Sequence, residues 1–145
     1  MRVRLQFAFD QRVGADLSTV TTFFHDVANL LRVSPSFPPL RLEAPSGTRV
    51  QSGAEFTLSM DFGIGALSWN TVIESVHADG TFTDTFRGNV FREWKHTHRF
   101  SPLDGGTVIH DEIECRPAWW FGPFAWLFVR ILFAVRKARL GALFS

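Results

Sequence analysis

The sequence has one cysteine, no tyrosine and a net charge of only +1. A single cysteine, Cys115, excludes an internal disulfide and a thiolate metal cluster, and it is compatible with a reducing compartment. A charge this close to zero gives no overall field that would attract nucleic acid, so we expect no nucleic-acid partner. The first 14 residues lack both a continuous apolar run and a small-residue cleavage site. We therefore expect no signal peptide and a cytoplasmic protein.

A long apolar run free of charge is also missing. The most apolar stretch, residues 124–135, is interrupted by Arg130, whereas a membrane span needs about 20 apolar residues. Because proline suits the first turn of a helix, we expect a helix over residues 123–143 that is buried along much of its length against a sheet. An alternative is that its aromatic start and basic end contact a bilayer surface, which would make the protein membrane-associated. The basic end consists of Arg136, Lys137 and Arg139, which we otherwise expect to form a solvated helix end.

Aromatic residues are abundant, with 16 Phe and 5 Trp among 145 residues. A chain of this length forms one domain, here residues 1–145, with enough material to bury a core and a cavity inside it. An interior rich in rings and poor in hydroxyl groups suits a pocket for an apolar ligand as well as it suits plain packing.

The order of patterns along the chain predicts an α+β fold. Residues 2–10 alternate apolar and polar side chains, which is typical of a half-buried strand. Apolar residues from Val20 to Leu31 then recur at helical spacing, and this helical segment must stop before Pro35. Four further strands are predicted at residues 40–43, 55–61, 67–76 and 81–86, separated by short loops rich in Gly, Ser or Pro. We expect these strands to form an antiparallel meander.

The residues that carry chemistry lie on the two strands that follow. In residues 92–100, Trp94, His96, His98 and Phe100 share one face, because successive strand side chains point to opposite sides. The sequence Asp-Gly-Gly then predicts a hairpin turn, and the next strand, residues 107–115, aims Asp111 at the same interior. On the strand at residues 81–86, Asp84 lies on the face of Phe82 and Phe86. Two histidines and two aspartates are therefore expected on an otherwise apolar face.

Buried carboxylates need donors, and His96, His98, Arg87 or Arg92 could supply them. One interpretation is a closed hydrogen-bond network that only satisfies itself. A second is that His96, His98 and Asp111 fix the polar end of an apolar ligand. A third is a metal site with the same three residues as ligands. We favour no metal and no other cofactor, because no further inward ligand is evident.

Residues 82–111 contain four motifs: Phe-Thr-Asp at 82–84, Trp-Lys-His-Thr-His-Arg-Phe at 94–100, Gly-Gly-Thr at 105–107, and Asp111. Taken together, they resemble the START-like, Bet v 1-like superfamily of SRPBCC domains, and within it a subgroup of small bacterial ligand-binding proteins. The resemblance implies a helix-grip fold, in which a curved antiparallel sheet wraps around a long C-terminal helix and two short helices lie near the N-terminus. It implies no catalytic set.

The resemblance also implies a cavity between the sheet and the helix. Its wall is expected to consist of Phe56, Leu58, Trp69, Phe82, Asp84, Trp94, His96, His98, Asp111, Phe124, Phe128, Leu132 and Val135. The function predicted is binding of a hydrophobic small molecule or lipid, as a carrier, sensor or sequestering protein, rather than catalysis. The alternatives are a cyclase or dehydratase that uses His96, His98 and Asp111 as acid and base groups, and a membrane-surface module.

Overall fold

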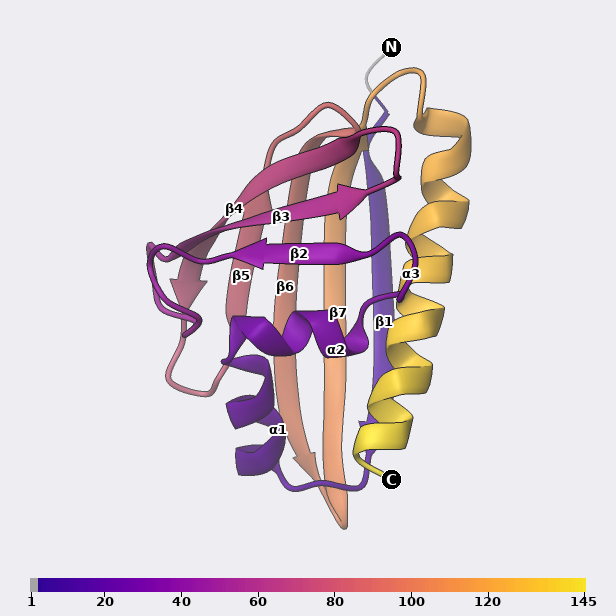
Figure 1. The fold of residues 1–145 in the computed structure, drawn as a ribbon. Coiled ribbons are helices and arrows are strands. Elements are labelled where there is room, and N and C mark those ends of the chain that lie inside the picture. Colours follow the sequence, from indigo (N-terminus) through magenta and orange to yellow (C-terminus); the bar gives the residue numbers. More distant parts are fainter. Residues whose placement is uncertain (1–2) are drawn as a thin grey trace.

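The computed structural model describes residues 3–145 and confirms the predicted fold class: an antiparallel sheet of seven strands with helices against one face (Figure 1). The strands are paired in the order β1-β7-β6-β5-β4-β3-β2. Their bounds are β1 Leu5–Val13, β2 Leu40–Glu43, β3 Glu55–Asp61, β4 Ala66–Val76, β5 Phe82–Phe86, β6 Phe91–Leu103 and β7 Gly106–Pro117. The first strand begins at Leu5, later than predicted, and residues 1–2 lie outside the described part of the chain.

The helical segment predicted near the N-terminus is divided into short pieces. The pieces are α1 Leu17–Phe24, the 3-10 turn η1 Val27–Asn29 and α2 Leu30–Val33, followed much later by the long helix α3 Gly122–Leu143. Asp16 caps α1, since its side chain accepts a hydrogen bond from the backbone N–H of Thr19 at 2.8 Å. As predicted, α2 ends before Pro35. No helix in residues 3–145 is long and apolar enough to cross a membrane.

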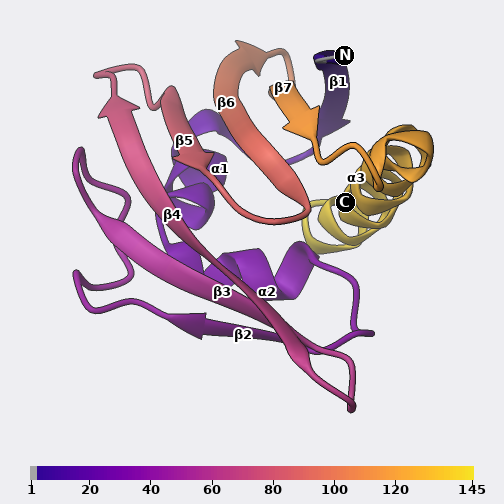
Figure 2. The same ribbon diagram turned by 90° about the horizontal axis from the view of Figure 1, so that it is seen from above.

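The sheet is strongly curved, and all the helices lie on its inner side. Seen from above, it curls from β1 and β7 round to β2 and β3, with α1 and α2 inside the curve (Figure 2). The long helix α3 runs beside β1 along the open side of the curve (Figures 1 and 2). The inward faces of β5, β6 and β7 therefore look toward helices, as the helix-grip arrangement requires.

Buried apolar residues form two separate clusters, one at each end of this interior. The first packs the first turns of α3 against β1, β6 and β7, and the second packs α1 and α2 against the sheet. The first cluster is built on Phe7, Phe91, Trp94, Ile113, Cys115, Ala125, Val129 and Phe133. The second contains Val20, Phe24, Val27, Val33, Phe56, Leu58, Ile73, Phe82, Phe100, Ile109 and Leu140, among others.

Candidate functional site

A layer of polar side chains crosses the interior between the two apolar clusters. On β6, His96 and His98 lie between Trp94 of the first cluster and Phe100 of the second. On the neighbouring elements, a polar residue again lies between residues of the two clusters. These polar residues are Asp84 on β5, Asp111 on β7 and Arg136 on α3. Strand alternation explains why the three strand positions point inward. We call the five side chains His96, His98, Asp84, Asp111 and Arg136 the polar layer.

The histidines and aspartates of the polar layer are paired crosswise. In the sheet register His98 is opposite Asp111 and His96 is opposite Asp84. Each histidine nevertheless bonds to the aspartate opposite the other: His96 Nε2 lies 2.8 Å from Asp111 Oδ1, and His98 Nε2 lies 2.7 Å from Asp84 Oδ2. An ionised carboxylate can only accept, so we assign the ring proton of both histidines to Nε2. These diagonal bonds join β5, β6 and β7.

Ring stacking holds the histidines in place. The His96 and His98 rings are stacked with centroids 3.7 Å apart, and the other face of His98 lies 4.1 Å from the Phe82 ring. Phe133 meets His96 edge to face at 5.5 Å. His98 is therefore enclosed between two rings, and its Nδ1 atom is buried without a hydrogen-bond partner.

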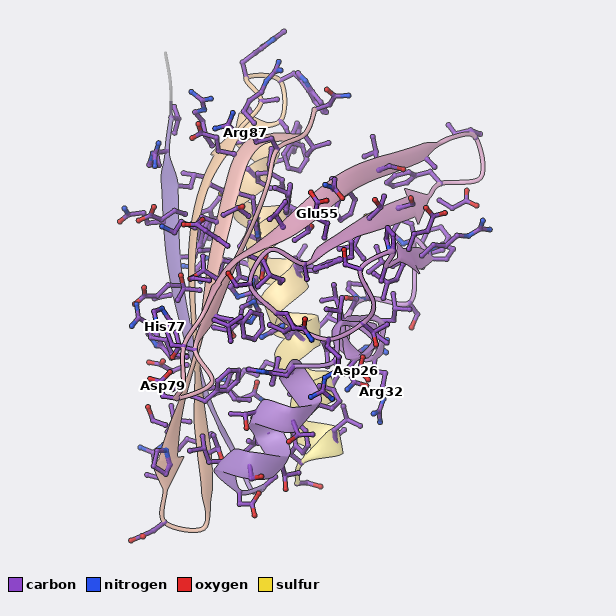
Figure 3. The ribbon with its side chains drawn as sticks, turned by 90° about the vertical axis from the view of Figure 1, so that its left-hand side faces the viewer. Asp26, Arg32, Glu55, His77, Asp79 and Arg87 are labelled. Atoms are coloured by element: carbon purple, nitrogen blue, oxygen red, sulfur yellow. The ribbon has the colours of Figure 1, made fainter. Side chains whose placement is uncertain are left out.

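Arg136 is the donor that the sequence did not identify. Its Nη2 atom donates to Asp111 Oδ1 at 2.9 Å, and its guanidinium lies over the Phe24 ring at 4.9 Å. The assignment of Arg136 to a solvated basic helix end was wrong, because the residue is only 6% exposed. Arg87 and Arg92, the arginines proposed as donors, are exposed, and Arg87 lies toward the upper end of the sheet in Figure 3.

The orientation of α3 also differs from the prediction. Phe124 was expected to face the cavity, but it is 62% exposed, and Phe128 and Leu132 are only partly buried. The face that packs on the sheet carries Ala125, Val129, Phe133, Arg136 and Leu140. The helix is apolar on nearly every side, so its sequence has no polar face from which its rotation could be inferred.

A small cavity of about 50 Å³, partly open to solvent, adjoins the polar layer on the side of α1 and α2. Of the predicted wall residues, Phe56, Phe82, Asp84 and His98 line it. Leu58, Trp69, Trp94, His96 and Asp111 lie elsewhere on the inner face and do not line it. Sequence reasoning missed the wall that the short helices and neighbouring segments supply. The principal missed residues are Phe24, Val27, Val33, Val50, Ile73 and Arg136.

A larger hollow, about 540 Å³, lies elsewhere on the molecule, but it does not resemble a ligand pocket. It is open and lies mainly over outward-facing strand residues, including Arg4, Glu93, Lys95 and Glu114. Exposed charges of both signs satisfy one another and water. We therefore place the candidate site at the small cavity beside the polar layer.

Burial and neighbouring charges set the ionisation of the polar layer. Burial raises the pKa of Asp84 to about 6. Burial would also raise the pKa of Asp111, but the Arg136 guanidinium and the His96 hydrogen bond outweigh it and hold that pKa well below its usual range. The pKa of His98 is well below its usual value because of burial and the nearby His96. At neutral pH, Arg136 balances the charge of Asp111, and Asp84 has no cation of its own.

Three side chains could also approach a metal ion together. One nitrogen of His96, one nitrogen of His98 and a carboxylate oxygen of Asp84 lie within 4.8 Å of one another. The carboxylate of this set is Asp84, whereas the sequence suggested Asp111. The Nε2 atoms of both histidines already bond to carboxylates, so a metal bound there through Nε2 would have to break these bonds.

Comparisons with known proteins identify the fold. No family model and no curated protein matches the sequence. A solved structure from Chromobacterium violaceum is similar with a TM-score of 0.75 and 12% identity, over 96% of both chains. Norcoclaurine synthase from Thalictrum flavum, in complex with dopamine and hydroxybenzaldehyde, gives a TM-score of 0.68 and 15% identity, over 98% of this chain and 87% of that one. Major latex-like protein 151 from Panax ginseng gives 0.69 and 10%, over 97% of both chains.

Proposed function

We propose that this chain, which has the helix-grip fold of the Bet v 1-like superfamily, binds a small hydrophobic molecule or lipid between its sheet and its helices, as a carrier, sensor or sequestering protein. The observation that supports this proposal is the apolar cavity with Asp84, His98 and Arg136 at its wall. Small-molecule sites are mostly apolar, with a few polar groups that orient the ligand. Two residues that line the cavity, His98 and Arg136, each carry a buried nitrogen, Nδ1 and Nε, without a hydrogen-bond partner.

The polar end of the site favours a ligand that donates a hydrogen bond. Asp84 Oδ2 accepts from His98, and no described residue donates to Asp84 Oδ1. Arg136 is engaged with Asp111, so the Asp84 carboxylate is free to accept from a ligand. A hydroxyl group at one end of an otherwise apolar molecule fits this arrangement.

The cavity must enlarge before it can hold such a ligand. A volume of about 50 Å³ is enough for about one or two water molecules, whereas ligand pockets are about 300–1,000 Å³. Several lining residues come from α1, η1 and α2, which are short and are joined to the sheet by loops. Movement of these helices away from the sheet would open the cavity while β6 and β7 keep the polar layer in place.

Native mass spectrometry, followed by titration with an apolar alcohol, tests this function. We expect a co-purified apolar molecule, or saturable binding of 2-naphthol to one site. Val27 is buried and lines the cavity, so Val27→Phe should fill it and weaken binding, whereas Leu103→Phe on an exposed strand end should not. A clean protein mass combined with no saturable binding would contradict the proposal.

A second candidate function is acid-base catalysis of the cyclase or dehydratase type. It is favoured by the two buried histidine-aspartate pairs and by the pKa of Asp84, which at about 6 is suited to proton transfer near neutral pH. Replacing His96 and His98 by Gln separates the two functions. Binding of an apolar ligand should survive this change, whereas conversion of the co-purified molecule, followed by its mass, would be lost.

A further inference from the structure

The outward face of α3 is apolar, and no other part of residues 3–145 covers it. In most proteins a helix that is apolar on all sides is buried on all sides. Here the inner face packs on the sheet, and the opposite face is left to solvent. Within residues 119–131, the exposed large apolar residues are Trp119, Trp120, Phe124, Trp126, Leu127 and Ile131. Six such side chains within 13 residues form a patch of the kind that marks an interaction surface.

Helical spacing places the centre of this patch on one line. Phe124, Leu127 and Ile131 are separated by three and four residues, so they lie on the same side of the helix. Trp119 and Trp120 precede the first turn and extend the patch at the end where α3 begins. Trp119 is 84% exposed, which is unusual for the largest apolar side chain. We call these residues, together with Trp126, the aromatic face.

The charges along α3 identify the partner. The helix contains four basic residues and no acidic one. Arg136 is buried in the polar layer, but Arg130 and Lys137 are exposed on the outer side. Arg130 lies 4.5 Å over the Trp126 ring, which places a cation at the edge of the aromatic face. Trp-rich apolar faces on helices whose charged residues are all basic are typical of helices that lie in the interface of an anionic bilayer.

We propose that the aromatic face docks the protein on the surface of an anionic lipid bilayer, with α3 lying in the plane of the interface. The contact is made by the first half of the helix and the tryptophans before it, and not by the basic end, whose Arg136 is unavailable. This surface is separate from the small cavity beside the polar layer, so the inference does not depend on ligand binding.

Vesicle co-sedimentation tests the proposal. The wild-type protein should bind vesicles of phosphatidylcholine with phosphatidylserine more tightly than vesicles of phosphatidylcholine alone. Exposed tryptophans of the aromatic face should give a blue shift in emission on binding. Leu127→Gln combined with Ile131→Gln should weaken binding by about tenfold or more, because two apolar anchors are lost.

Leu103→Gln is the matched control. Leu103 is 40% exposed, compared with 54% for Leu127, and it lies at the β6–β7 turn, the opposite end of the molecule from the start of α3 (Figure 1). This control should bind vesicles like the wild type, and circular dichroism should give equal melting temperatures for all three proteins. Three results would overturn the proposal: no wild-type binding to either vesicle, equal binding by the double variant, or a concentration-dependent dimer in light scattering that the double variant abolishes in place of vesicle binding.

Discussion

Arg136 Nη2 lies 2.9 Å from Asp111 Oδ1 in the interior, and this ion pair joins α3 to the central hairpin of the sheet. Asp111 accepts from His96 at the same oxygen. One carboxylate therefore links β6, β7 and α3, and the first prediction concerns the loss of its cation.

Arg136→Met should be strongly destabilising. The substitution leaves the Asp111 carboxylate buried without its cation, and breaking a buried pair in this way costs about 3–5 kcal/mol. The control is Lys137→Met at the next, exposed position, which should change the free energy of unfolding by less than about 0.5 kcal/mol. Urea unfolding followed by circular dichroism measures both. Equal stability of the two variants would contradict the structural role assigned to Arg136.

Asp84→Asn should stabilise the protein above pH 6. Because the pKa of Asp84 rises from 3.8 to about 6 on folding, its contribution to stability is complete below pH 4 and is lost as the pH rises through 6. A shift of this size corresponds to at most about 3 kcal/mol. The lowered pKa of His98 destabilises the fold at acid pH, the opposite end of the pH range. Unfolding curves from pH 4 to 8, with the exposed Asp104→Asn as control, should show a gap that grows with pH for Asp84→Asn alone.

The ligand class can be tested with two molecules that differ only in whether one oxygen carries a hydrogen or a methyl group. 2-Naphthol donates a hydrogen bond, and 2-methoxynaphthalene does not. A hydrogen bond to a charged group contributes about 1.5–3 kcal/mol, so at pH 8 we expect the naphthol to bind about tenfold more tightly or better. Asp84→Asn should reduce this preference to a few fold. Equal binding of the two compounds by the wild type would argue against Asp84 as the acceptor, while leaving apolar binding itself intact.

Gly106→Ala should be more costly than Gly105→Ala. A methyl group on Gly106 would collide with the backbone carbonyl of Val13, so the end of β1 would have to move. Gly105 has a φ of +78° but open space around it, and alanine there should cost about 1 kcal/mol. Melting temperatures of the two variants provide the comparison. A larger loss at Gly105 would show that turn conformation, and not the close approach of β1, controls this end of the sheet.

The sequence was sufficient to predict which side chains of the strands point inward. His96, His98, Asp84 and Asp111 were each placed correctly, because the side-chain period of a strand is two and neighbouring residues mark the buried face. The fold class followed from the order of elements and from the motifs around residues 94–111. A regular alternation carries this information without any knowledge of tertiary contacts.

The sequence was insufficient to predict which face of α3 packs on the sheet. Arg136 follows a long apolar run and stands next to Lys137, so it was grouped with the solvated basic residues. The spacing Ala125, Val129, Phe133, Arg136 could have indicated one inward face with a small residue close to the sheet, but Phe124, Phe128 and Leu132 offered an equally regular alternative. Which face packs inward is decided by the fit of Ala125 and Val129 against the sheet, and that depends on strands far away in the chain.

The polar layer divides the core into two compartments that share few side chains. The one nearer the start of α3 is the cluster of Phe7, Phe91 and Trp94, and the one beneath the short helices contains the cavity. An engineer could therefore reshape the compartment that contains the cavity, by exchanging residues such as Val33 or Ile73, without repacking the other. The histidine and aspartate pairs form a fixed boundary between the two compartments. The size and the polarity of the ligand can therefore be changed in separate designs.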